Sequence, residues 1–464
     1  MDKNNLKGRE LRFFCLFTAA LLFVAAFLFD TAEDVFSGFY TILTSRDILI
    51  TDYCELAGFG AAFFNAGVML IIAVFMVELS EIPFTGLTLM AIFMNVGFAF
   101  WGKNPVNILP ILFGTWIHAK LHRQRFARYI YTGFFAACLA PFVSELCYIL
   151  PFNVYVNVTL AVATGIMIGM ITPAIASHTA TGHMGYSLFN VGFAGGIIAF
   201  VLHSILKALG LPVNQVLIWK YGRHPGILIG LYIYFIIAII YGIWLTGWKP
   251  SAIKGIFVHP GRAVADYILM EGAGATLMSM GLLGIAAESY VLLAGGDLSG
   301  PILGGIITVF GVGAFGAHLR NYIPVLVGVW LSTFFTIHFY GSYAVIIAAL
   351  FSVGLSPIAG QYGPIAGVVA GMLHSVVVMS TGAFYGGLNL YNNGFSCGWV
   401  AIVMVPTMES FKQQLKLAGL IMAEKEEKEE KERQEAGEPK ENTQAAKVRN
   451  LRKRLRLWIM KKGK

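Results

Sequence analysis

Apolar stretches of about 20 residues recur along the chain from residue 11 to about residue 411. A helix of that length spans the hydrocarbon core of a bilayer, and a lipid-facing backbone must satisfy its own hydrogen bonds. A β-barrel would instead show segments of about 10 residues that alternate apolar and polar, whereas runs such as 228–244 do not alternate. Only 12% of the residues are charged, about half the share in a soluble domain. The sequence therefore predicts an all-α, polytopic membrane protein.

The chain contains an internal duplication. One block recurs at a constant offset of 272 − 58 = 214 residues, through the pairs Gly58/Gly272, Gly86/Gly300, Gly97/Gly311, Asn107/Asn321, Pro110/Pro324 and Trp116/Trp330. A second block recurs at an offset of 202, where G-Y-S-L-F-N-V-G-F-A-G-G from Gly185 matches G-L-N-L-Y-N-N-G-F-S-C-G from Gly387. We predict five parts: a cytoplasmic N-terminus (1–10), membrane repeat 1 (11–206), an external linker (207–224), membrane repeat 2 (225–411) and a cytoplasmic charged tail (412–464).

Equivalent loops of the two repeats carry opposite charge biases. Loop 118–129 contains Lys120, Arg123, Arg125 and Arg128, while its counterpart 332–343 has no Lys or Arg; after the first helix the bias reverses, with Asp30, Glu33 and Asp34 against Lys249, Lys254 and Arg262. By the positive-inside rule, this pattern predicts inverted-topology repeats with both termini in the cytoplasm. About seven helical segments per repeat give fourteen spans, or ten if short segments such as 107–121 are re-entrant.

The net charge of +8 comes from the tail. Residues 447–464 hold nine Lys or Arg and no acid, so the rest of the chain nets about 8 − 9 = −1, and we predict no nucleic-acid partner. Apolar residues recur at helical spacing among these cations, which is typical of a helix bound to anionic lipid head groups. The alternative is that the positive charges of this segment only keep it on the cytoplasmic side and so fix the topology. The five cysteines are scattered and form no C-x-x-C pair, so we predict no disulfide framework and no metal site.

Two paired segments interrupt the apolar runs, and paired interruptions in inverted repeats point to a transport site. The first pair, 97–110 and 311–324, contains the polar residues Lys103, Asn104, Asn107, His318, Arg320 and Asn321. Buried in a membrane, such residues would imply a role. A short extramembrane turn is the alternative that we favour for the cations.

The second pair, 177–196 and 379–398, is rich in glycine and neutral polar residues and is the better candidate for a solute site. Amides and hydroxyls donate and accept hydrogen bonds without burying a charge. We predict solute-binding residues Asn190, Asn392, Asn393, Asn389, Thr179, Thr381, Ser187 and Ser380. The alternative is that small residues only let helices pack closely and that the asparagines bond between helices.

Two carboxylates lie in apolar runs, where an ionisable residue suggests a function. Glu145 and Glu288 are candidates for proton or ion coupling, although Glu145 also suits a membrane-interface position. No G-x-S-x-G, H-E-x-x-H or P-loop pattern occurs, so we predict no enzyme activity and no cofactor.

The duplicated blocks N-V-G-F-A-F-W-G-K-N-P from Asn95 and L-Y-N-N-G-F-S-C-G-W from Leu390 resemble a family of duplicated bacterial membrane proteins known only as a domain of unknown function (1576 type). This resemblance implies an inner-membrane location and no particular activity. The Gly- and Asn-rich segments are also similar to those of urea channels. We predict a transporter or channel for a small polar solute, neutral and urea-like or a small ion, between the repeats. A scaffold or sensor with a basic cytoplasmic tail is the alternative, and a homo-oligomer stays open.

Overall fold

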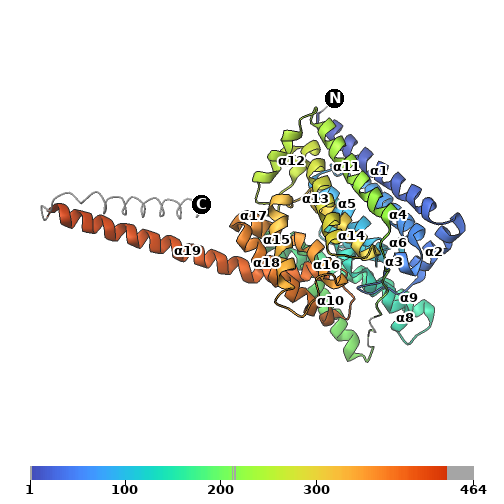
Figure 1. Ribbon diagram of the computed structural model, residues 1–464. Helices are drawn as coiled ribbons and strands as arrows, with labels where there is room; N and C mark the ends of the chain where they lie inside the picture. Colours follow the sequence, from blue (N-terminus) through green and yellow to red (C-terminus); the bar gives the residue numbers. More distant parts are fainter. Residues whose placement is uncertain (1–2, 212, 214–215, 436–464) are drawn as a thin grey trace. The chain divides into compact units, whose positions relative to one another are not determined.

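The computed structural model describes residues 3–211, 213 and 216–435, and in this part of the chain all regular elements are helices (Figure 1). Repeat 1 comprises α1 (Lys3–Phe29), α2 (Ala32–Thr44), α3 (Tyr53–Leu56), α4 (Phe59–Leu79), α5 (Gly86–Phe98), α6 (Pro105–Leu121), α7 (Ile130–Ala136), α8 (Ala140–Ile149), α9 (Val154–Gly182) and α10 (Asn190–Ala208). Repeat 2 comprises α11 (Pro225–Leu245), α12 (Tyr267–Glu271), α13 (Ala273–Leu293), α14 (Gly300–Val312), α15 (Leu319–Ser332), α16 (Tyr343–Phe351), α17 (Ser356–Tyr362), α18 (Pro364–Thr381) and α19 (Asn392–Glu435).

Ten helical segments in the described residues are long and apolar enough to cross a membrane. Five precede residue 209 and five follow residue 224, so the protein is a multi-pass membrane protein made of two repeats. The shorter helices α5 and α14 have 13 residues each, about 20 Å, which is too short to cross. The span count therefore agrees with the ten-span alternative rather than with fourteen spans.

Each repeat contains one re-entrant hairpin, α5–α6 in repeat 1 and α14–α15 in repeat 2. Glu81, just before α5, forms an ion pair of 2.8 Å with Arg125, just after α6, so the chain returns to the side from which it entered. In repeat 2, Gly341 follows α15 and Ala294 precedes α14. The two residues lie close together, since a Cβ added to Gly341 would be 3.0 Å from the carbonyl oxygen of Ala294. Both hairpins thus begin and end on one side.

The packing of α5 against α14 shows that the repeats are inverted. Gly86 at the start of α5 contacts the carbonyl of Ala314 just after α14, and Gly300 at the start of α14 contacts the carbonyl of Phe100 just after α5. These equivalent helices are therefore antiparallel, as an approximate two-fold axis in the membrane plane requires. Away from the hairpins, α1 and α11 lie side by side (Figure 1), where Thr18 and Tyr234 share a hydrogen bond of 2.9 Å.

Each hairpin helix is capped by a carboxylate of the other repeat. Asp266 accepts hydrogen bonds from the backbone N–H groups of Gly86 (2.8 Å) and Leu87 (3.1 Å) at the start of α5. Asp52 accepts one from the N–H of Gly300 (3.0 Å) at the start of α14. The two acids are equivalent, since 266 − 52 = 214. Carboxylates stabilise helix N-termini through the unpaired N–H groups and the helix dipole, so these caps join the two repeats.

Within the described residues, 3–401 form one compact unit, which contains both repeats up to the first turns of α19, and 402–435 belong to a second unit. The basic segment 447–464, which we predict to bind anionic lipid head groups, lies outside the described residues.

Candidate functional site

Asn190, the first residue of α10, joins the end of α9 to the start of α10. Its Oδ1 accepts hydrogen bonds from the Thr179 hydroxyl (2.8 Å) and from Nε2 of His183 (2.9 Å), and its Nδ2 donates to the carbonyl of Ala176 (2.8 Å). All three partners belong to repeat 1. The predicted residues Thr179 and Asn190 are thus brought together, in a bond pattern that fixes the loop between two helices.

Asn392 forms the same pattern in repeat 2. Its Oδ1 accepts from the Thr381 hydroxyl (2.7 Å) and from the Tyr385 hydroxyl, and its Nδ2 donates to the carbonyl of Val378 (3.2 Å). Every partner is displaced by 202 residues from its counterpart. The offset found in the sequence therefore describes a repeated hydrogen-bond motif, in which both asparagines bond within their own repeat.

The remaining predicted residues are spread among different environments. Asn393 is buried and faces Nε2 of His374 at 3.1 Å, while Asn389 is buried with its Nδ2 unpartnered and Ser187 is buried with its hydroxyl unpartnered. Ser380 is exposed. Glu145 is buried against Arg46, whose Nε donates at 3.0 Å, and both oxygens of the buried Glu288 lack a partner. The structure does not bring the two carboxylates into the cluster of asparagines.

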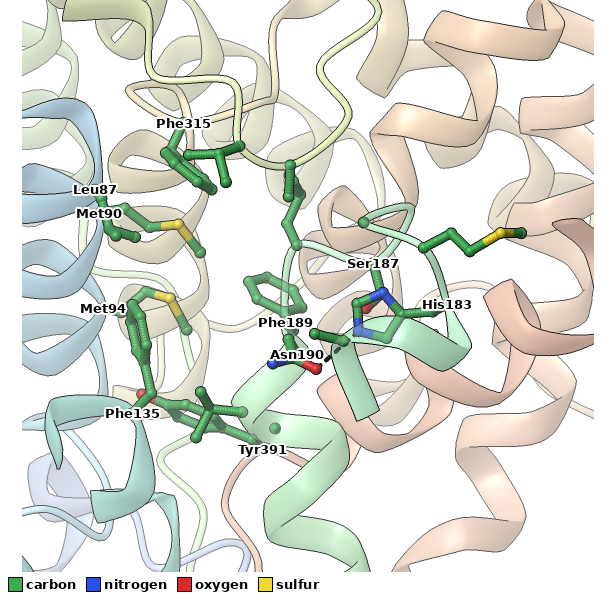
Figure 2. A pocket seen from close by; sticks show the side chains of 18 residues that line it. Leu87, Met90, Met94, Phe135, His183, Ser187, Phe189, Asn190, Phe315 and Tyr391 are labelled. Atoms are coloured by element: carbon green, nitrogen blue, oxygen red, sulfur yellow. Dashed lines mark hydrogen bonds between the residues drawn. The ribbon is translucent and has the colours of Figure 1, made fainter. Parts of the chain in front are cut away.

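A half-open cavity of about 410 Å³ lies between the two repeats. Repeat 1 contributes α5, α7 and the loop from α9 to α10, and repeat 2 contributes Ala263, Val264, Phe315 and Tyr391. Figure 2 shows the apolar side chains of α5 on one side and Ser187, His183 and Asn190 on the other. The 18 lining residues include no Asp, Glu, Lys or Arg. This combination of apolar walls and a few polar groups is typical of small-molecule sites.

The polar side of this cavity has hydrogen-bonding capacity that the protein leaves unused. Asn190 donates through Nδ2, so its Oδ1 is the acceptor that faces His183, and Nε2 of His183 must carry the proton. Nδ1 of His183 and Oγ of Ser187 are buried and have no partner. The first turn of α10 lines the cavity, and this helix has no side-chain cap, so its first N–H groups have no partner within the helix. Unpaired buried polar groups are costly, which suits a site that a solute completes.

Beneath the cavity, the lining residue Tyr391 contacts the buried Lys103. The ammonium group of Lys103 donates to the Tyr391 hydroxyl (2.9 Å), to Oδ1 of Asn95 (3.0 Å) and to the carbonyl of Phe134 (3.2 Å). No salt bridge to Lys103 occurs in the described part of the chain. The extramembrane turn that we favoured for this cation is therefore wrong, because Lys103 is fully buried at the tip of a re-entrant hairpin.

Sequence reasoning missed two residues of the cavity as site residues, His183 and Tyr391. At the offset of 202 they correspond to Tyr385 and Phe189, so both lie at positions where the repeats differ. A search for departures from the repeat, rather than for matches, would have found them.

Residues 31–208 and 245–410 both match the model of one family, described as "Protein of unknown function (DUF1576)". The chain belongs to this family. The two DUF1576 matches cover most of the two predicted repeats, so the resemblance found in the duplicated blocks is confirmed. No curated protein and no solved structure matches the chain, and the similarity to urea channels gains no support from the comparisons.

Proposed function

We propose that this protein transports a small solute across the membrane through the cavity between the repeats. The observation that carries the proposal is an asymmetry within a symmetric frame. The loop from α9 to α10 supplies six of the residues that line the half-open cavity, whereas its counterpart from α18 to α19 supplies only Tyr391. In transporters built from inverted repeats, the solute site lies between the repeats, and movement of one repeat against the other opens it to one side at a time.

The re-entrant hairpins support this proposal. Irregular backbone at membrane depth occurs in proteins where it is buried in the structure or lines a cavity, and both hairpin tips lie against the other repeat. The apolar side of the cavity comes from α5, the first helix of one hairpin. Relative movement of the antiparallel pair α5 and α14 would therefore change the cavity directly.

Charges near the cavity suggest which side it faces. Arg262 donates from Nε to the carbonyl of the lining residue Met184 (2.7 Å), and Ala263 beside it lines the cavity. The loop that carries Arg262 also carries Lys249 and Lys254. From the positive-inside rule we infer that this side is cytoplasmic, which would also put both chain termini in the cytoplasm.

Solute flux into proteoliposomes tests the proposal. Urea, formamide, ammonium and simple ions are screened with the wild-type protein and with Met94→Trp, which places an indole in the cavity. Ile229→Trp is the matched control, because Ile229 is 59% exposed on α11. We expect flux of at least one solute in the wild type and the control, and its loss in Met94→Trp. Absence of flux for every solute would favour the scaffold or sensor, and equal flux in Met94→Trp would place the pathway elsewhere.

A further inference from the structure

We propose that the cavity binds an organic anion with a carboxylate head and an apolar body. This inference rests on the proposed function and names the class of solute. It starts from the polar side of the cavity, where the uncapped first turn of α10 and the unpartnered hydroxyl of Ser187 converge. Ser187 is only 1% exposed, and its hydroxyl has no partner among the described residues.

The N-terminus of a helix attracts negative charge through its free N–H groups and its dipole. The N-terminus of α10 is supplemented by the Ser187 hydroxyl, which can donate to the same head group. Nδ1 of His183 accepts when the ring is neutral and donates when it is protonated, so it can meet either an ionised or a protonated carboxyl.

Positive charge approaches the cavity at both ends. Lys103 lies behind Tyr391, whose hydroxyl oxygen accepts from the ammonium group; its proton is therefore directed away from that group and can be donated to a further acceptor. Arg262 stands at the mouth, bonded to the carbonyl of Met184. Asp266, two residues after the lining residue Val264, has both oxygens bonded to N–H groups of α5 or α12. The cavity is thus lined by hydrogen-bond donors and no carboxylate, and Lys103 and Arg262 are bonded to two of its lining residues.

The opposite wall of the cavity favours an apolar body in the rest of the ligand. Leu87, Met90 and Met94 of α5, with Phe135 of α7, form an apolar surface. Methionine thioethers adapt to varied shapes and make favourable contacts with aromatic rings. A volume of about 410 Å³ is far larger than an inorganic anion needs, so the space favours a carboxylate that carries a hydrocarbon or aromatic group.

The test compares three ligands of one shape and different charge, namely benzoate, benzamide and benzylammonium. Binding to the full-length protein in detergent is measured by calorimetry and by the shift of the thermal unfolding midpoint, which a bound ligand raises. We expect benzoate to bind at least tenfold more tightly than benzamide, and benzylammonium to bind most weakly. Equal affinities for the three would mean an apolar cavity without a head-group site, and preference for benzylammonium would contradict an anion site.

Two variants locate the binding. Ser187→Ala should weaken benzoate binding about tenfold, because a hydrogen bond to a charged group is lost, and should leave benzamide less affected. Ser204→Ala is the control, since Ser204 is exposed on the same helix and bonds the carbonyl of Phe200 at 2.7 Å. An unchanged benzoate affinity in Ser187→Ala overturns the assignment. If Ser187→Ala fails to fold, Tyr391→Phe serves in its place, with loss of benzoate selectivity expected.

A lipid could supply the same anionic chemistry. Competition with dioleoyl phosphatidylglycerol separates the sources: benzoate binding that resists the lipid supports a soluble anion, and complete displacement by equimolar lipid overturns it. Failure of this inference is distinguishable from failure of the proposed function. Benzoate binding without flux of any solute would support the anion site and contradict transport. Flux that Met94→Trp blocks, without selectivity for the carboxylate, would support transport and contradict the anion site.

Discussion

The loop between α9 and α10 and its counterpart between α18 and α19 share one hydrogen-bond pattern but contribute unequally to the lining of the cavity. In the first, His183 bonds Asn190 through one ring nitrogen and leaves the other unpartnered beside the cavity. In the second, the fully buried Tyr385 takes the equivalent place, and the carbonyl of the neighbouring Phe384 lies 3.1 Å from Nδ1 of His203 on α10. A shared motif thus positions both loops, although the first lines much of the cavity and the second contributes only Tyr391 to it.

The largest effects on stability are expected where the first turns of α10 and α19 meet. An added Cβ at Gly192 would lie 3.1 Å from the Cα of Gly394, and the reverse holds at Gly394. We expect Gly192→Leu and Gly394→Leu each to destabilise the fold by about 3 kcal/mol or more, because overpacking displaces backbone. Thermal unfolding in detergent measures this, with Gly230→Leu as the control, since nothing lies within 4 Å of an added Cβ there. A tolerated leucine at either position would show that the contact is loose.

The next largest loss of stability is expected when Asn190 or Asn392 is removed, and the size of the loss should differ between the two loops. Asn392 is 8% exposed and Asn190 is half-buried, so Asn392→Ala leaves its partners in drier surroundings. We expect a loss of about 2–3 kcal/mol for Asn392→Ala and about 1 kcal/mol for Asn190→Ala, in keeping with the cost of unpaired buried groups. The unfolding midpoints of the two variants, and of the double variant, give the comparison. The reverse order would mean that the open loop bears more of the stability.

Replacement of His183 by the residue at the equivalent position, tyrosine, tests whether His183 keeps the polar end of the cavity accessible to a ligand. His183→Tyr gives the first loop the side chain of the second, and a tyrosine there can bond Asn190 as Tyr385 bonds Asn392. We expect a folded protein whose benzoate affinity falls at least tenfold, about 1.4 kcal/mol, because the ring fills the polar end of the cavity. Calorimetry measures the affinity, and the unfolding midpoint shows whether the fold is kept. Wild-type affinity in this variant would break the link between His183 and the cavity.

The smallest effect on stability is expected at Ser187. Its hydroxyl has no partner, so Ser187→Ala should change the free energy of unfolding by less than about 0.5 kcal/mol even though ligand binding weakens. Its counterpart Asn389 accepts from the backbone N–H of Tyr391 (3.0 Å), and Asn389→Ala should cost about 1 kcal/mol. Equal costs in thermal unfolding would mean that Ser187 has a partner in the free protein.

Much of this architecture could be predicted from the sequence, because duplication leaves a constant offset. The offset of 214 pairs Gly86 with Gly300 and the offset of 202 pairs Asn190 with Asn392, and each pair plays the same structural part in both repeats. The depth of Lys103 could not be predicted, since an extramembrane turn and a re-entrant tip have the same local composition. Only the packing of α5 against α14 places that tip inside the protein.

The cavity itself was beyond sequence reasoning for a related reason. Identical residues at matched positions indicate what the repeats share, whereas the share of the cavity that each loop lines depends on how neighbouring elements pack. The exchange of His183 for Tyr385 is visible in the alignment of the repeats, but its meaning rests on the volume around each ring.

The carboxylate caps that join the two repeats also affect the order of folding during synthesis. The N–H group of Gly86 can bond Asp266 only after a further 180 residues have been made. At about 5–20 residues per second, α5 has its local cap from Thr85 but lacks the Asp266 carboxylate for roughly 10–40 seconds while the chain up to Asp266 is made. The two halves are therefore interdependent in time as well as in space, and the N-terminal half alone should not reach a finished structure.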